Sequence, residues 1–350
     1  METIDADTHL VESARTWEFM NKAFMRYKPQ LLLNPDPEAP GTQREFWRID
    51  GNIFFKRAFD FERSGTTEET REASSIAARL AHMDELGVDV QVLYPTMFLL
   101  PITNKPDVEF ALHTAYNRWV ADICRQGKGR LRWAAQLPLL SMEESLKELR
   151  WAVEQGACAV HMRPFDANRP PSSPYFNPLY EEATRLDVPI CLHSGNGNTV
   201  LTGEYFAYPE LTFSLAKLSA IGACHALIMS GTCARFPKLR WAIIETSASW
   251  VPYLFHDIPP RLRRLMGREP DPSHHLLRDN NIFIGCQTDD DLPYVLKYAG
   301  EDNLVIGSDY GHADTATELE ALRHLSEMKQ VSDGAVKRIL YDNAKALYAL

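Results

Sequence analysis

The feature that most constrains the fold is a set of eight short apolar runs distributed along the chain. Most of them are almost continuously hydrophobic and rich in β-branched residues, instead of alternating with polar residues. This pattern is typical of strands that are buried on both faces of a parallel sheet. The eight runs are Thr3–His9, Val88–Pro95, Leu131–Leu137, Ala157–Arg163, Val188–Ser194, Leu239–Glu245, Asn281–Gln287 and Leu304–Asp309.

Helical patterns separate these runs. Asp107–Gln126 carries apolar residues at helical spacing, and Ser141–Glu154 opens with a sequence that fits a capping box. Eight strands that alternate with helices predict a (β/α)₈ TIM-type barrel, formed as a single domain by residues 1–350. A doubly wound open sheet is the alternative, but no G-x-G-x-x-G motif follows an early strand.

Residues 13–70 interrupt the alternation and are rich in Trp, Phe, Arg and Pro. An insertion after the first strand leaves from the C-terminal face of a barrel, where active sites form. We therefore expect residues 13–70 to form a cap or an oligomer contact, with a solvated loop as the alternative.

Charge and cysteine content exclude several classes of partner. The chain has 37 Lys+Arg against 47 Asp+Glu, a net charge of −10, which argues against a nucleic-acid partner or an anionic membrane surface. Its six cysteines form no C-x-x-C pair, which fits a reducing, cytoplasmic location. The opening METIDADTHL lacks the features of a signal peptide, and no apolar stretch approaches the ~18 residues that span a membrane.

Four ligand-type side chains are expected at the ends of strands. Asp7 and His9 are two residues apart, so they point to the same face of the first strand, near its C-terminal end. His193 ends the fifth run and Asp309 the eighth, and barrel closure places the eighth strand beside the first. Two carboxylates and two imidazoles suit one divalent metal ion, zinc or manganese, with a position left for water.

Three segments resemble the amidohydrolase superfamily. Ile4–His9 is similar to its opening metal-ligand motif, residues 235–245 to the sixth-strand region of the amidohydrolase-related group, and residues 307–312 to its eighth-strand motif. That group includes aminocarboxymuconate semialdehyde decarboxylase and γ-resorcylate decarboxylase. The resemblance covers nearly the whole chain. It implies the metal ligands Asp7, His9, His193 and Asp309, and a homodimer or larger homo-oligomer.

The chain departs from the family pattern at two positions. The first ligand position often holds His in the family, whereas here it is Asp7. The decarboxylases usually carry a His at the end of the sixth strand, whereas this chain has Glu245. A carboxylate there would repel an anionic substrate unless it is protonated or paired, so this residue weakens the decarboxylase interpretation.

Five further residues are candidates for substrate contact. Arg163 ends the fourth run and presents a guanidinium suited to a carboxylate, and His161 lies two residues earlier on the same face. Tyr94 ends the second run, and Trp250 follows Glu245 by five residues. For His161 and Trp250 a packing role is the alternative. His312 is expected either to contact substrate or to orient Asp309.

These residues predict an enzyme that acts on a small molecule. The first hypothesis is a hydrolase, in which a metal-activated water attacks a carbonyl-type carbon and Asp309 or Glu245 accepts the proton. The second is a metal-dependent decarboxylase of an aromatic or unsaturated carboxylic acid. The third is a binding barrel without metal or catalysis, which metal analysis would separate from the other two.

Overall fold

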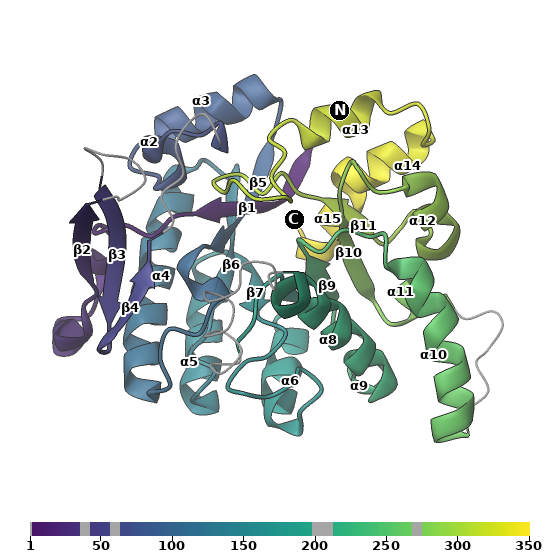
Figure 1. The fold of residues 1–350 in the computed structure, drawn as a ribbon, viewed down its shortest axis with the longest axis horizontal. Coiled ribbons are helices and arrows are strands. Elements are labelled where there is room, and N and C mark those ends of the chain that lie inside the picture. Colours follow the sequence, from purple (N-terminus) through teal and green to yellow (C-terminus); the bar gives the residue numbers. More distant parts are fainter. Residues whose placement is uncertain (1, 36–42, 57–63, 198–212, 268–274) are drawn as a thin grey trace.

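Eight parallel strands form the centre of the molecule, in chain order around the sheet. The computed structural model describes residues 2–35, 43–56, 64–197, 213–267 and 275–350. The fold is the expected (β/α)₈ barrel (Figure 1). Its strands are β1 (Ile4–Leu10), β5 (Val90–Pro95), β6 (Leu131–Gln136), β7 (Ala157–Met162), β8 (Ile190–His193), β9 (Trp241–Ile244), β10 (Ile282–Cys286) and β11 (Leu304–Ile306).

The barrel closes between the first strand and the residues that follow the last. Thr8 and Tyr310 form a parallel bridge. The amide of His9 donates to the carbonyl of Tyr310 at 2.7 Å, and the amide of Asp309 donates to the carbonyl of Asp7 at 3.0 Å. This closure brings residues some 300 positions apart in the sequence to one edge of the barrel.

Helices cover the outside of the barrel (Figure 1). Ser141 precedes α5, but its side chain forms no capping hydrogen bond, so the expected capping box is not made. No helix in the described ranges is both long and apolar enough to cross a lipid bilayer. The helices are α2 (Glu68–Arg71), α3 (Ile76–Leu86), α4 (Pro106–Gln126), α5 (Met142–Glu154), α6 (Asn177–Arg185), α8 (Leu218–Met229), α9 (Thr232–Arg235), α10 (Val251–Met266), α11 (Leu276–Asp279), α12 (Leu292–Ala299), α13 (Ala321–Glu327), α14 (Asp333–Lys337) and α15 (Asn343–Tyr348).

The buried apolar residues form two layers. The larger lies between the strands and the helices, and the smaller fills the inside of the barrel. The inner layer includes Ile4, Val92, Ile244 and Phe283, and it is completed by Tyr348 of α15. The floor below the C-terminal ends of the strands is therefore packed, and any chemistry is confined to the mouth.

The segment 13–70 contains structure that its sequence did not predict. Two short 3-10 helices (Thr16–Phe19 and Lys22–Tyr27) precede an antiparallel sheet of β2 (Gln30–Pro35), β3 (Gln43–Ile49) and β4 (Asn52–Phe55), at the left of Figure 1. Trp17 and Trp47 are buried and meet edge to face, with ring centroids 6.0 Å apart. This contact joins the small sheet to the first 3-10 helix of the same segment. Its role as a cap stays a prediction.

Candidate metal centre

A break in the alternation of β1 turns Asp7 into the barrel mouth. The pairing of β1 with β5 shifts register between Asp5 and Thr8. As a result, the consecutive residues Ala6 and Asp7 both line the same cavity, which regular alternation would not allow. The irregularity adds a carboxylate directly above the apolar interior of the barrel.

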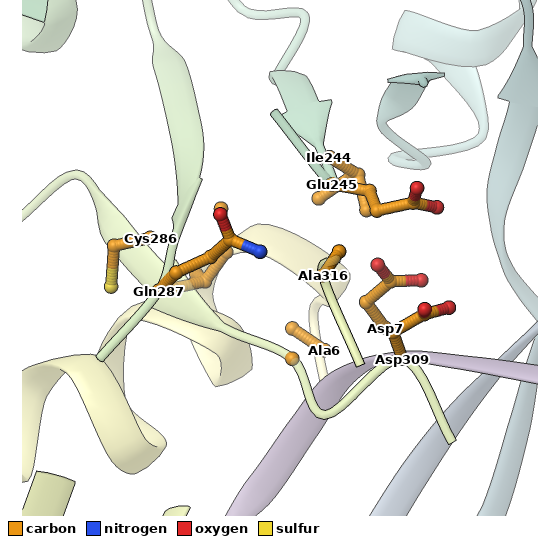
Figure 2. A pocket seen from close by; sticks show the side chains of 11 residues that line it. Ala6, Asp7, Ile244, Glu245, Cys286, Gln287, Asp309 and Ala316 are labelled. Atoms are coloured by element: carbon orange, nitrogen blue, oxygen red, sulfur yellow. The ribbon is translucent and has the colours of Figure 1, made fainter. Parts of the chain in front are cut away.

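Glu245 and Asp309 reach the mouth through an uncommon backbone conformation. Glu245 directly follows the last residue of β9 and has a φ of +60°, and Asp309 has a φ of +52°. Residues other than glycine adopt this left-handed region at a cost, and such residues gather at functional sites. Figure 2 shows the carboxylates of Asp7, Glu245 and Asp309 turned toward one another.

Six ligand-type side chains meet at the mouth in two overlapping groups: Asp7, His9, His193 and Glu245 form one, and His9, Glu245, Asp309 and His312 form the other. Nε2 of His193 lies 3.1 Å from Oδ1 of Asp7 and 3.4 Å from Oε2 of Glu245. Nε2 of His9 lies 3.4 Å from Oδ1 of Asp7, 3.4 Å from Oδ1 of Asp309 and 3.9 Å from Oε2 of Glu245. The structure therefore brings together the four predicted ligands and Glu245, on strands that the sequence separates widely.

The two histidines are oriented as metal ligands usually are. Nδ1 of His9 contacts the carbonyl of Pro95 at 2.9 Å, and Nδ1 of His193 contacts the carbonyl of Ser194 at 3.0 Å. A carbonyl can only accept, so each Nδ1 carries a proton, and Nε2 is the nitrogen that each ring turns toward the carboxylates. Among the described residues, Nε2 of His9 forms no hydrogen bond although it is completely buried.

Burial and mutual proximity shift the pKa values of the side chains in this cluster. Burial raises the pKa of Asp309 to about 6 and lowers the pKa of His9 to about 4. Burial alone would raise the pKa of Asp7, but the adjacent His193 ring outweighs it and holds that pKa well below its usual range. Burial likewise opposes a charge on His193, and Asp7 overcomes it and raises the pKa of His193.

A divalent cation among these atoms would compensate both the carboxylate charges and the opposed lone pairs. The donors present, imidazole nitrogens and carboxylate oxygens, therefore fit a metal ion such as zinc or manganese.

Arg163 is positioned differently from what the sequence suggested. It lies at the end of β7 and is almost completely buried. Its amide and its Nε donate to the two oxygens of Asp166 at 2.7 and 2.9 Å, and Nη2 contacts the same carboxylate. Because Asp166 already occupies the edge of the guanidinium formed by Nε and Nη2, a substrate carboxylate would have to approach its other edge, formed by Nη1 and the second N–H of Nη2. Substrate binding by Arg163 stays a prediction.

His161 and Tyr94 lie inside the barrel beside His193. The ring centroid of His161 is 5.9 Å from that of His193, and the ring centroid of Tyr94 is 5.2 Å from it. Nδ1 of His161 contacts Oε1 of Gln136 at 2.5 Å, and the hydroxyl of Tyr94 contacts that of Tyr348 at 2.9 Å. Tyr94 therefore forms part of the floor beneath the cluster, and its contact with substrate stays a prediction.

The last two candidates behave differently from each other. Trp250 precedes α10 and packs against the apolar layer between the strands and the helices. This position corresponds to the packing role, which was the alternative to substrate contact. Nδ1 of His312 lies 2.8 Å from Oδ1 of Asp309, and its ring stacks on His9 with centroids 3.8 Å apart. This geometry corresponds to the second of the two roles expected for His312, the orientation of Asp309.

Sequence reasoning missed several residues that support the cluster from behind. Thr317 donates to Oδ2 of Asp309 at 2.6 Å, and Thr96 contacts Nε2 of His312 at 2.9 Å. Nη1 of Arg79 donates to the carbonyl of His9 at 3.3 Å, and its guanidinium lies 3.7 Å from the centre of the Tyr310 ring. No sequence motif marks these residues. Thr96 and Arg79 contact residues 216 and 70 positions away, whereas Thr317 lies only eight residues after Asp309.

Fold and site together define a (β/α)₈ barrel with a cluster of metal-ligand side chains at its mouth. The chain belongs to the amidohydrolase family, whose model matches residues 4–350. Membership of this family makes the chain an enzyme, either a hydrolase or a carboxy-lyase.

A curated relative of the chain is a decarboxylase. The chain is 28% identical over 211 residues to γ-resorcylate decarboxylase of Rhodococcus jostii (strain RHA1). The match covers 52% of this chain and 61% of that relative, so the chain spans less than two thirds of the relative's length.

Solved structures share the fold. An amidohydrolase of Mycobacterium avium subsp. paratuberculosis K-10 superposes with a TM-score of 0.79 at 20% identity over 99% of both chains. A 5-carboxyvanillate decarboxylase of Novosphingobium aromaticivorans DSM 12444 superposes with a TM-score of 0.65 at 18% identity, over 81% of this chain and 82% of its own. The latter was solved with manganese and 4-hydroxy-3-methoxy-5-nitrobenzoic acid.

Proposed function

We propose that this chain is a metal-dependent decarboxylase of a small carboxylic acid, with one divalent ion held by Asp7, His9, His193 and Asp309. The observation that carries the proposal is the closeness of their ligand atoms: Nε2 of His9 lies 3.4 Å from Oδ1 of Asp7 and 3.4 Å from Oδ1 of Asp309, and Nε2 of His193 lies 3.1 Å from Oδ1 of Asp7. Decarboxylases among the relatives support this reaction over hydrolysis. Zinc suits the two imidazoles and two carboxylates, and manganese is the alternative because a relative contains it.

When bound, the ion would supply positive charge that holds the substrate carboxylate and stabilises the negative charge that develops during the reaction. The bond from the substrate carbon to the carboxyl group breaks, its electron pair stays on that carbon, and CO₂ leaves. A proton must then reach the same carbon, so the site needs an acid within hydrogen-bonding reach of it.

Glu245 is the residue we assign to this proton transfer. Oδ2 of Asp309 accepts a hydrogen bond from Thr317 at 2.6 Å, and its Oδ1 lies 2.8 Å from Nδ1 of His312. Glu245 comes from a different strand and reaches the cluster beside Nε2 of His193, at 3.4 Å. In its protonated form Glu245 can donate to the carbanionic carbon without repelling the substrate carboxylate, which answers the objection raised by a carboxylate at this position.

Hydrolysis remains the second candidate, and the same residue favours it. An ionised Glu245 can accept a proton from the water that attacks a carbonyl carbon, and a carboxylate is a common base for that step. The two reactions thus require opposite protonation states of Glu245 in the resting enzyme.

Isotope incorporation separates the two reactions. Metal-loaded protein is incubated with a panel of aromatic carboxylic acids in D₂O, and with a panel of lactones and amides in H₂¹⁸O. Decarboxylation releases CO₂ and places one deuterium on the carbon that lost it, whereas hydrolysis places ¹⁸O in a new carboxylate. Deuterated product together with CO₂ supports the proposal, and ¹⁸O incorporation with no CO₂ release would replace it with hydrolysis.

The Glu245→Gln variant tests the assignment of the proton donor. It keeps the shape of the side chain but removes the ionisable group, so turnover should fall by about 10²–10⁴ while metal content stays at the wild-type level. Glu182→Gln, on α6 and paired there with Arg185, is the control and should keep full activity. Loss of metal in Glu245→Gln would make Glu245 a ligand instead, and unchanged turnover would leave Asp309 as the proton-transfer group.

A further inference from the structure

The segment that follows β5 lies against the residues that hold Asp309. The hydroxyl of Thr96 contacts Nε2 of His312 at 2.9 Å, and Nδ1 of the same ring lies 2.8 Å from Oδ1 of Asp309. Thr96 and His312 are buried and 216 positions apart in the sequence. A row of three side chains therefore leads from the end of one strand to a proposed metal ligand on another.

Glu12 holds Thr96 in this position. The amide of Thr96 donates to Oε1 of Glu12 at 3.2 Å, and the amide of Met97 donates to Oε2 at 2.8 Å. Glu12 is 2% exposed, so water competes little for these bonds. The hydroxyl of Thr96 is thus presented to His312 by a backbone that has little freedom to move.

His312 lies between Asp309 and Thr96. Its Nδ1 is 2.8 Å from Oδ1 of Asp309, a position in which a proton on Nδ1 would be attracted to the carboxylate. The ring is fully buried and stacks on His9, with ring centroids 3.8 Å apart. In a neutral ring with its proton on Nδ1, Nε2 is an acceptor, and the hydroxyl of Thr96 is the donor that matches it.

Asp309 is held from its other side as well. Its Oδ2 accepts a hydrogen bond from Thr317 at 2.6 Å. With His312 at Oδ1 and Thr317 at Oδ2, the carboxylate plane has one orientation, in which Oδ1 also lies 3.4 Å from Nε2 of His9. The direction in which Asp309 presents Oδ1 to a metal ion therefore depends on His312, and through it on Thr96.

We infer that Thr96 is a positioning residue, which fixes the tautomer and orientation of His312 and thereby the affinity of the cluster for its metal ion. This inference rests on the proposed function, because it takes Asp309 as a metal ligand. Residues that orient metal ligands in this way typically change metal affinity by 10–100-fold when they are removed.

Two substitutions at position 96 and one control test the inference. Thr96→Val keeps the shape of the side chain but removes the hydroxyl, and Thr96→Ser keeps the hydroxyl. Thr184→Val removes a hydroxyl that donates to the carbonyl of Tyr180 within α6, at 2.7 Å. For each protein, the zinc and manganese dissociation constants are measured by competition with a chromophoric chelator, and the thermal unfolding of the metal-free form is recorded separately.

We expect Thr96→Val to bind metal about 10–100-fold more weakly than wild type, and Thr96→Ser and Thr184→Val to stay within about threefold. Thr96→Ala replaces Thr96→Val if the valine variant does not fold. Equal metal affinity in wild type and Thr96→Val would overturn the inference, as would a raised KM with unchanged metal affinity, because Thr96 would then contact substrate. A wild-type protein that binds no metal would overturn the proposed function and the inference together, so the two failures are distinguishable.

Discussion

Gly307 is the position at which the smallest possible side chain should disrupt the metal centre. A Cβ atom added there would lie 2.2 Å from Cβ of Asp7 and 2.9 Å from its amide nitrogen. Ordinary contacts of this kind begin near 3.4 Å, so one of the two Cβ atoms must move by about 1.2 Å. The atoms in conflict belong to the main chain and its first side-chain carbon, so no rotamer change can relieve the clash.

The size of that displacement sets the expected effect of Gly307→Ala. Metal–ligand distances tolerate about ±0.2 Å, so a shift of this size in a ligand should lower metal affinity by at least ~100-fold. Forcing an extra methyl group into a packed interior also costs about 1–3 kcal/mol of unfolding free energy. The measurements are a chelator-competition titration and chemical denaturation of the metal-free protein.

Gly222→Ala is the matched control. Gly222 lies within α8, and a Cβ atom added there meets no atom within 4 Å. Because alanine favours the helix over glycine, this variant should be unchanged or more stable by up to ~1 kcal/mol, with wild-type metal affinity. If Gly307→Ala bound metal as tightly as Gly222→Ala, either Asp7 would not be a ligand or β1 would not lie where the structure has it.

Two further predictions concern the cluster and the effect of pH. His193→Ala should lose most of its metal and activity while the metal-free fold persists, because the barrel core does not depend on the ion; full metal occupancy measured by elemental analysis would contradict the ligand assignment. Burial raises the pKa of Glu109 from 4.5 to about 8, so the folded protein binds more protons than the unfolded chain between these values. Stability should therefore fall as pH rises through this window, by at most ~1.4 kcal/mol per pH unit, and this contribution should vanish in Glu109→Gln, which can still accept from the amide of Leu140. Parallel denaturation curves of wild type and Glu109→Gln at pH 6 and pH 9 would check this, and an identical pH dependence in the two proteins would refute it.

Much of the architecture was predictable because it follows from local periodicity. A strand buried on both faces must be apolar at nearly every position. All eight strands could therefore be recognised from their own residues, without knowing which strands they pair with. The antiparallel sheet at β2, β3 and β4 was not predicted. Its strands are mostly exposed or half-buried, so they lack the apolar runs on which the prediction depended.

The identity of the candidate ligands also came from the sequence, since polar residues at the C-terminal ends of the apolar strands of a barrel lie near its mouth. The homodimer or larger homo-oligomer, by contrast, stays a prediction. The arrangement of the site was decided by the tertiary structure. The register shift in β1 that turns Asp7 inward occurs in its pairing with β5, and Glu245 has a left-handed backbone directly after β9.

The remaining interactions join segments that meet only when the barrel closes. Thr96 lies 216 residues from His312, and Gly307 is required only because Asp7 packs against it. The sequence by itself determined which residues stand at strand ends, because burial and side-chain alternation act over a few neighbours. Only the tertiary structure decided which atoms face one another, because register, backbone conformation and closure are properties of the whole barrel.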